Sequence, residues 1–147
     1  MKSLMELIEQ KGGKVYTIKK EETVEAALKQ MVDYNIGSLV VVDEKGKMVG
    51  IFTERDLLRK VFVRKLDITK HKVEEFMTAN PVVAFPETRL NEAMNIMTKK
   101  RIRHLPVVEA GKVVGLVSIG DIVAALLKEA EVQIKYLKDY IEDKYPV

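Results

Sequence analysis

The sequence predicts an α/β (α+β) fold of two β-α-β-β-α repeats, packed sheet to sheet with pseudo-twofold symmetry, plus an N-terminal helix and a long C-terminal helix. Three observations predict it. The chain matches itself when it is shifted by 66 residues. Each copy alternates short apolar runs, typical of strands, with an amphipathic stretch at helical spacing. The length of 147 residues suits one compact domain and is short for two independent ones.

The internal repeat is the strongest of these signals. Identical residues meet at a shift of 66, which becomes 65 after one residue drops out in a turn. We therefore divide the chain into an N-terminal helix and linker (1–14), a first repeat (15–64), a linker with a short helix (65–80), a second repeat (81–128) and a C-terminal helical extension (129–147). The matched pairs include Glu21 and Glu87, Ala27 and Ala93, Met31 and Met97, Ile36 and Ile102, Gly50 and Gly115, and Asp56 and Asp121.

Apolar spacing and turn residues define the elements of the first copy. Thr23 is a suitable helix cap, and it precedes four apolar residues at the spacing of one helical face. The run Ser38 to Val42 is almost entirely apolar, as expected of a strand buried on both faces. The elements expected are a strand at 14–18, a helix after Thr23 with the face Val24, Ala27, Leu28 and Met31, the buried strand at 38–42, a returning strand at 47–52 and a closing helix at 54–63.

The second copy has the same plan. Thr88 is the expected helix cap, the buried strand is expected at 104–108, and the returning strand at 113–117 follows a turn. A single unit of about 50 residues buries its faces poorly, so we expect the two copies to pack against each other. The apolar helical face of this copy is Leu90, Ala93, Met94 and Met97.

Two further helices lie outside the repeat. Residues 3–11 form a short amphipathic helix with Leu4, Met5 and Ile8 directed inward, and two glycines end it. The last helix continues to about Asp143, and its apolar residues follow the 4-3-4-3-4 spacing of a helix that meets another helix. Either the protein's own body or a second subunit would cover this stripe. Its residues are Val123, Leu127, Ala130, Ile134, Leu137 and Ile141.

Composition excludes several functional classes. The chain has no cysteine and two histidines, His71 and His104, which excludes disulfides, thiol catalysis and a multi-histidine metal site. It also has no nucleophile–histidine–acid set and no Walker-type loop, so we do not expect an enzyme. The net charge of +3 argues against nucleic acid as a partner, and the basic stretch from Arg55 to Lys72 is more typical of a solvated face.

No stretch of the sequence predicts a membrane protein. No apolar run approaches the ~20 residues that a membrane span requires, and the N-terminus lacks the apolar block of a signal peptide. We therefore expect a cytoplasmic protein with no membrane partner.

One motif follows the returning strand of both copies. It consists of Gly, two apolar residues, Thr or Ser, two variable residues and Asp, and it runs from Gly50 to Asp56 and from Gly115 to Asp121. The hydroxyl and carboxylate three residues apart are typical of a capping box at a helix start. The same helix start offers amide groups and partial positive charge to a phosphate, while the carboxylate could accept both hydroxyls of a ribose. The capping and nucleotide interpretations are compatible, and the motif leaves both open.

With these motifs in place, the sequence resembles a tandem CBS-domain pair (a Bateman module), as found in IMP dehydrogenase, in the regulatory subunit of AMP-activated protein kinase and in stand-alone regulators. The similarity covers nearly the whole chain, and the full set of motifs, present twice and in order, is highly specific. The matching segments are Thr23 to Ala27, Ile36 to Val42, Gly50 to Asp56, Met77 to Val82, Arg101 to Val108, and Val114 to Asp121.

The resemblance implies a regulatory module without an obligatory cofactor, which binds AMP, ADP, ATP or S-adenosylmethionine in two clefts between the repeats. It places Asp56 and Asp121 on ribose, and Thr53 and Ser118 near the α-phosphate. The implied base contacts are Val15, Thr17, Ile36 and Gly37 in one cleft, and Val83, Ile102 and Pro106 in the other.

The resemblance also implies that the two clefts are unequal. Arg103 and His104 stand where the family often has basic phosphate contacts, whereas Gly37 and Ser38 at the matching positions carry no charge. Taken alone, His104 would be interpreted as a core histidine, but its place beside Arg103 and its match to a cleft position favour phosphate contact. Family members usually form homodimers, which we expect here, and a regulated protein partner is implied but not identified. The alternative function is an interaction scaffold with empty clefts.

Overall fold

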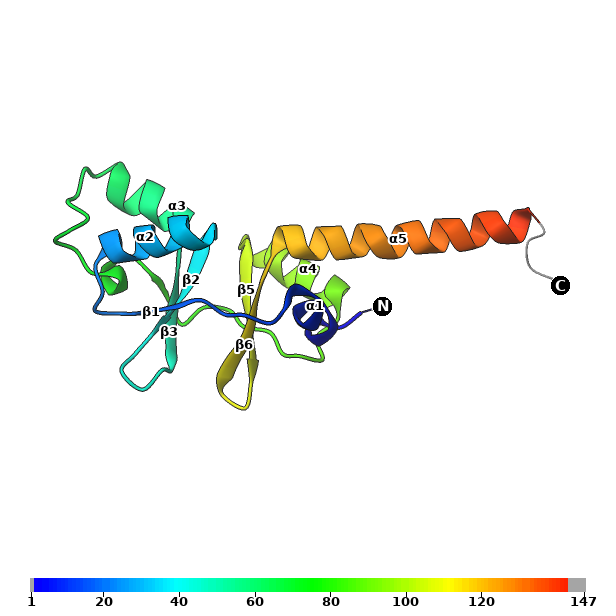
Figure 1. Cartoon of the computed structure of the whole chain (residues 1–147), viewed down its shortest axis with the longest axis horizontal. Coiled ribbons are helices and arrows are strands. Elements are labelled where there is room, and N and C mark those ends of the chain that lie inside the picture. The colour runs from blue at the N-terminus through cyan, green and yellow to red at the C-terminus, as the bar shows by residue number, and fades with distance from the viewer. Residues whose placement is uncertain (1, 143–147) are drawn as a thin grey trace.

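Two sheets face each other in the middle of the molecule, with helices on their outer sides (Figure 1). The computed structural model describes residues 2–142. It confirms the predicted α+β fold with an N-terminal helix and a long C-terminal helix. The elements are α1 (Leu4–Lys11), β1 (Thr17–Lys19), α2 (Val24–Tyr34), β2 (Ser38–Val42), β3 (Met48–Thr53), α3 (Glu54–Asp56), η1 (Leu57–Phe62), η2 (Val73–Glu75), β4 (Thr78–Ala79), α4 (Leu90–Lys100), β5 (His104–Glu109), β6 (Lys112–Ser118) and α5 (Ile119–Ile141).

The sheets follow the internal repeat. The first has the order β1-β2-β3-β4, with β1 and β2 parallel and the other pairs antiparallel. The second consists of the antiparallel pair β5-β6, and a parallel bridge from Ala84 to Val107 stands where Ile18 pairs with Val41 in the first repeat. Leu39 and Val41 point into the first core, so the intervening Val40, which is also fully buried, faces the other sheet.

The helix ends show where local sequence signals were sufficient. The Thr23 hydroxyl accepts a hydrogen bond from the Ala26 N–H, so the predicted cap of α2 is confirmed. The prediction that Thr88 caps α4 is wrong. The capping position belongs to Arg89, which makes no side-chain cap, and the Thr88 hydroxyl accepts instead from the Phe85 N–H in the preceding turn.

The closing helix of the first repeat differs from its prediction in winding. Residues 54–63 were expected to form one α-helix, but after Asp56 the chain takes the wider π-helical winding over η1. A Val63 N–H donates to the Leu58 carbonyl, five residues back. This winding keeps Val61 in the first core while Leu58 and Phe62 remain exposed.

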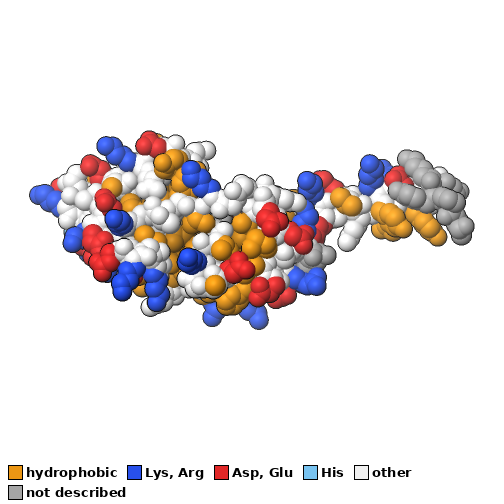
Figure 2. All heavy atoms as spheres, turned by 60° about the horizontal axis from the view of Figure 1, so that its bottom comes forward, with side chains coloured by type: hydrophobic (Ala, Val, Ile, Leu, Met, Phe, Trp, Pro, Cys, Tyr) orange, Lys and Arg blue, Asp and Glu red, His pale blue; other side chains and the backbone are white. Residues whose placement is uncertain are grey.

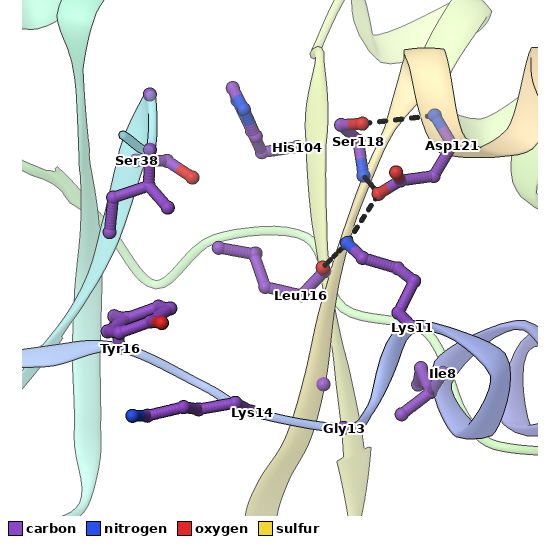
Figure 3. A pocket seen from close by; sticks show the side chains of 13 residues that line it. Ile8, Lys11, Gly13, Lys14, Tyr16, Ser38, His104, Leu116, Ser118 and Asp121 are labelled. Carbon is purple, nitrogen blue, oxygen red and sulfur yellow. Dashed lines mark hydrogen bonds and ion pairs between the residues drawn. The ribbon is translucent and has the colours of Figure 1, made fainter. Parts of the chain in front are cut away.

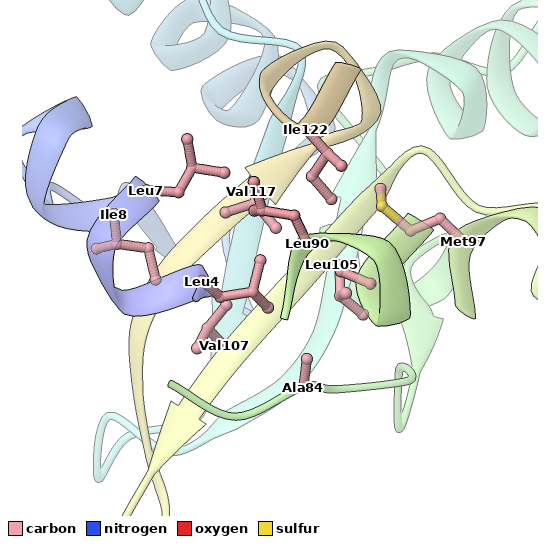
Figure 4. Close-up of a cluster of buried hydrophobic side chains, with 11 residues drawn as sticks. Leu4, Leu7, Ile8, Ala84, Leu90, Met97, Leu105, Val107, Val117 and Ile122 are labelled. Atoms are coloured by element: carbon pink, nitrogen blue, oxygen red, sulfur yellow. The ribbon is translucent and has the colours of Figure 1, made fainter. Parts of the chain in front are cut away.

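Each repeat has its own core, and each core is completed by a segment from outside the repeat. Val73 and Phe76 of the linker join the first core. Helix α1, although it precedes the first repeat, packs into the second core (Figure 4). Its buried residues are Leu4, Leu7 and Ile8; Met5, which was predicted to point inward, is only half-buried.

Close packing explains why both returning strands carry a glycine. A Cβ at Gly50 would lie 2.7 Å from the Thr78 carbonyl oxygen of β4, and a Cβ at Gly115 would lie 2.5 Å from Ile8 Cδ1 of α1. Real side chains do not approach this closely, so each glycine leaves room for the segment that completes its core. The N-terminal helix therefore occupies on the second repeat the place that the linker occupies on the first.

Helix α5 leaves the body after its first turns (Figure 1). Ile122 is fully buried in the second core, with Ala125 and Leu126 packed against it. The predicted apolar stripe lies on a different face, and all its residues are exposed, so the protein's own body does not cover it. The helix ends at Ile141, and Asp143, its predicted end, lies outside the described residues. Within residues 2–142, no helix combines the length and apolar character needed to cross a membrane.

Candidate functional site

A cleft of about 320 Å³ opens between the two repeats beside α1 (Figure 3). Three parts of the chain form its walls: the start of the first repeat with the start of β2, the ends of β5 and β6 with the start of α5, and the end of α1 with the residues that follow it. The lining residues are Tyr16, Ile36, Gly37 and Ser38, then His104, Gly115, Leu116, Ser118 and Asp121, and finally Ile8, Lys11, Gly13 and Lys14.

Asp121 lies where β6 passes into α5, and it forms a capping box with Ser118. The Ser118 N–H donates to Asp121 Oδ2 at 2.8 Å, and the Asp121 N–H donates to Ser118 Oγ at 3.1 Å. The capping interpretation of this motif is therefore confirmed. The carboxylate is nevertheless open to the cleft, with its side chain 25% exposed. Capping uses Oδ2 and leaves Oδ1 without a hydrogen bond from any described residue.

Lys11, the last residue of α1, reaches the same carboxylate. Its Nζ lies 2.6 Å from Asp121 Oδ2 and donates to the Leu116 carbonyl oxygen at 3.1 Å. Burial raises the pKa of Asp121, but the hydrogen bonds from Lys11 and Ser118 outweigh burial and hold that pKa below its ordinary value. The carboxylate is therefore ionised at neutral pH, and its charge is balanced by a residue from outside both repeats.

His104 stands on β5 between Ser38 and Ser118 (Figure 3). Burial lowers the pKa of its imidazole, and the nearby carboxylates of Asp121 and Glu54 only partly oppose this. The ring is therefore neutral at pH 7 in the free protein. A neutral imidazole has one donor and one acceptor nitrogen, and a bound anion would favour its protonated form.

An aromatic pair on the first repeat contributes one ring to the cleft, because Tyr16 lines it and Tyr34 packs against Tyr16. The rings of Tyr16 and Tyr34 lie 4.5 Å apart between centroids, and Lys14 Nζ lies 5.0 Å from the Tyr16 centroid and 5.8 Å from that of Tyr34. These distances are typical of cation–π contact. Tyr16 thus presents an aromatic ring, and Lys14 a positive charge, to the cleft.

The repeat-matched carboxylate, Asp56, has a different environment. Its residue is only 7% exposed, and both oxygens are engaged. Oδ2 accepts from the Thr53 N–H at 2.9 Å and the Thr53 hydroxyl at 3.2 Å, while Oδ1 pairs with Lys60 Nζ at 2.9 Å. Lys60 is one helical turn further along, and its repeat counterpart in α5 is Ala125. The first repeat therefore neutralises its carboxylate internally, whereas the second depends on α1.

Comparison with known proteins agrees with this geometry. A family model described as CBS domain matches residues 11–63 and 73–128. The chain belongs to the CBS-domain family. The CBS domain-containing protein CBSX3, mitochondrial, of Arabidopsis thaliana is 40% identical over 129 residues, which cover 85% of this chain and 63% of that protein. This chain thus spans less than two thirds of that relative's length.

Solved structures of CBS proteins superpose on most of the chain. The CBS-domain containing protein ATU1752 from Agrobacterium tumefaciens has a TM-score of 0.79 at 36% identity, covering 84% of this chain and 92% of that one. CBSX2, solved in complex with AMP, has a TM-score of 0.71 at 27% identity, covering 88% and 99%. The two-repeat arrangement is therefore that of a tandem CBS pair.

The CBS fold brings together six of the residues selected from the sequence and separates the rest. Ile36, Gly37, Ser38, His104, Ser118 and Asp121 line the cleft. The others lie elsewhere: Thr53 and Asp56 in the closed capping box, Thr17 and Arg103 exposed, Val15 and Val83 half-buried, Ile102 against the second core, and Pro106 buried in β5.

Sequence reasoning missed three polar residues of this cleft, namely Lys11, Lys14 and Tyr16. The first two lie before the first strand of the first repeat, at the edge of its CBS match, and they reach the cleft because α1 packs on the second repeat. No local motif carries that information. Among residues 2–142, no group of acidic and histidine side chains is arranged to hold a metal ion.

Proposed function

We propose that this CBS pair binds one adenosine nucleotide per chain in the Asp121 cleft and regulates a partner or its own assembly through the bound state. The observation that carries the proposal is the contrast between the two matched carboxylates. Asp121 lines an open cleft at a helix start, whereas Asp56 is closed off by Thr53 and Lys60. Of two matched sites, one is available to a ligand.

The start of α5 has suitable groups for a ribose phosphate. The Ile119 N–H donates to the Arg103 carbonyl, and the Asp121 N–H donates to Ser118 Oγ. The Gly120 N–H has no partner among the described residues, so it is available to a phosphate oxygen at the positive end of the helix dipole. The open Oδ1 of Asp121 can accept from ribose hydroxyls on the other side.

The charges of the cleft favour a phosphorylated ligand over a cationic one. Lys11 and Lys14 line the cleft together with one carboxylate, and a phosphate brings negative charge that would also favour a protonated His104. S-adenosylmethionine carries a positively charged sulfonium and lacks phosphate. The volume of about 320 Å³ is at the small end of the ~300–1,000 Å³ typical of ligand sites, which supports a mononucleotide. We therefore expect AMP to bind more tightly than S-adenosylmethionine.

The relatives support the proposal at the level of ligand class. CBSX2 was crystallised with AMP, and that structure superposes on most of this chain. The identity of the ligand, the regulated partner, a cytoplasmic location and the lack of catalytic activity all stay predictions for this protein.

Isothermal titration calorimetry of the purified chain tests the proposal. AMP, ADP, ATP and S-adenosylmethionine are titrated in turn, with GMP and UMP as matched controls that keep the ribose and the phosphate. We expect saturable heat with AMP, a stoichiometry of one per chain, and weaker binding of the controls. A stoichiometry of two would contradict the single open site. No heat with any adenosine ligand would favour the alternative of a scaffold with empty clefts.

A further inference from the structure

We propose that the projecting part of α5 forms an antiparallel helix pair with α5 of a second copy of this chain. This inference concerns a surface remote from the cleft and does not depend on the proposed ligand. It rests on three observations: the exposure of the apolar stripe, its regular spacing and the charges beside it.

The stripe is exposed over its whole length. Leu127 is 60% exposed, Ile134 61%, Leu137 57% and Ile141 77%. At 1.5 Å per residue, α5 is about 34 Å long, and most of it extends beyond the body. Single exposed apolar residues are normal on a protein surface, but a continuous row of them marks an interaction site. Figure 2 shows hydrophobic side chains gathered along one side of the projecting helix.

The spacing of the stripe suits another helix. Val123, Leu127, Ala130, Ile134, Leu137 and Ile141 are separated by alternating steps of four and three residues. With 3.6 residues per turn, they fall within about 80° of the helix circumference. A narrow seam of this kind is covered by a second helix carrying the same repeat. An identical copy satisfies that requirement, because a twofold axis makes one patch complementary to itself.

Charge decides the direction of the pairing. Glu131 and Lys138 both flank the stripe on the same side, two turns apart. If Ile134 packs against the partner's Leu137 in an antiparallel pair, Glu131 lies beside the partner's Lys138, and the twofold axis forms this contact twice. In a parallel pair, Lys138 would lie beside the partner's Gln133, and no pair of opposite charges would form. The antiparallel arrangement therefore matches both the apolar residues and the charges.

Disruption of the stripe tests whether it forms an interface. Leu137→Glu is a suitable variant because the side chain is exposed in the single chain, and Lys135→Glu, about 120° around the helix from the centre of the stripe, is its matched control. Sedimentation velocity is run at rising concentration. We expect the wild-type chain and Lys135→Glu to reach twice the 16.7 kDa chain mass, and Leu137→Glu to shift the midpoint at least tenfold upward. A dimer unaffected by Leu137→Glu, or a wild-type monomer throughout, would overturn the proposal.

The direction is tested by cross-linking, because the natural chain has no cysteine. Ile134→Cys and Leu137→Cys chains, one carrying an affinity tag, are mixed and oxidised. The antiparallel pair predicts mainly the mixed disulfide, with little linkage between identical variants and none through Lys135→Cys. Dominant linkage of Ile134→Cys to itself would overturn the antiparallel arrangement.

A charge exchange supplies an independent check. Glu131→Lys and Lys138→Glu should each weaken the dimer several-fold at low salt, and the double variant should restore it. Equal weakening by the double variant would refute the charge pairing.

Discussion

Exchange of each matched aspartate for asparagine should separate ligand binding from stability. An asparagine keeps the amide oxygen that accepts from the capping N–H, so both Asp121→Asn and Asp56→Asn preserve the start of their helices. Each loses a negative charge. Only Asp121 opens to the cleft, so only its exchange should weaken AMP binding. Asp56 is 7% exposed, so its exchange should mainly lower the stability of the fold.

The magnitudes follow from the contacts. A hydrogen bond to a charged group is worth about 1.5–3 kcal/mol, against about 0.5–1.5 kcal/mol for a neutral one. If Asp121→Asn replaces charged by neutral acceptors at two ribose hydroxyls, the binding free energy of AMP should weaken by about 2–3 kcal/mol. This corresponds to a roughly 30- to 150-fold rise in Kd. Its loss of stability should be small, about 0.5–1 kcal/mol, because the pair with Lys11 is partly exposed.

Asp56→Asn should show the opposite pattern. It leaves Lys60 facing an amide at a site where the carboxylate is almost fully buried, which should cost about 1–2 kcal/mol once the partial exposure of Lys60 is considered. At roughly 2–4 °C per kcal/mol for a chain of this size, Tm should fall by about 2–8 °C. Its AMP affinity should stay within about twofold of wild type.

Calorimetric titration and thermal unfolding of the same three proteins provide the measurements. If Asp56→Asn weakens AMP as much as Asp121→Asn does, the nucleotide occupies the first-repeat site and the argument from the open carboxylate is refuted. If Asp121→Asn binds AMP normally, the carboxylate does not contact the ribose.

Three further predictions concern pH and packing. Because the pKa of Asp121 is lowered in the folded state, its stabilisation should be complete above the unfolded value near 3.8 and lost as the pH falls through the lower folded value. The Tm gap between wild type and Asp121→Asn should therefore narrow as the pH falls below 3.8, and a constant gap would contradict this. A bound phosphate should raise the lowered pKa of His104, so AMP binding should be accompanied by proton uptake as the pH is lowered towards the ordinary histidine value of 6.5. Calorimetry in two buffers measures this uptake, and His104→Gln should reduce it. Gly50→Ala and Gly115→Ala should each lower the free energy of unfolding in urea by about 1–3 kcal/mol. The loss should be larger for Gly50→Ala, because a Cβ at residue 50 meets the Thr78 backbone whereas a Cβ at residue 115 meets the Ile8 side chain. The reverse order would show that α1 is the more rigid neighbour.

Local signals predicted the parts of the fold that local structure determines. The strand Ser38–Val42 was expected at its observed bounds, and Asn35 ends α2 in the left-handed conformation that asparagine tolerates. The prediction that Thr88 caps α4 was wrong because threonine can stabilise either a helix cap or a turn. Here its hydroxyl accepts a hydrogen bond within a turn. The repeat register already matched Arg89 to Thr23 and was the better guide.

The cleft depended on contacts that no local pattern encodes. Lys11 reaches Asp121 across 110 positions of sequence, because α1 packs on the second repeat. The sequence does contain a sign that Asp56 is paired within its own repeat. Lys60 lies one helical turn after Asp56, whereas the second repeat has Ala125 at the position that matches Lys60. Comparison of the repeats for differences as well as identities would have found that asymmetry.

The position of α1 also has a consequence for synthesis of the protein. This helix is synthesised before either repeat, but Ile122, part of the core that it joins, is made more than a hundred residues later. At ~5–20 residues per second, the nascent apolar helix waits about 5–20 s for its docking site. During that interval Leu4, Leu7 and Ile8 lack their native neighbours in the second core, so the nascent chain is exposed to chaperone capture or aggregation until α5 is made.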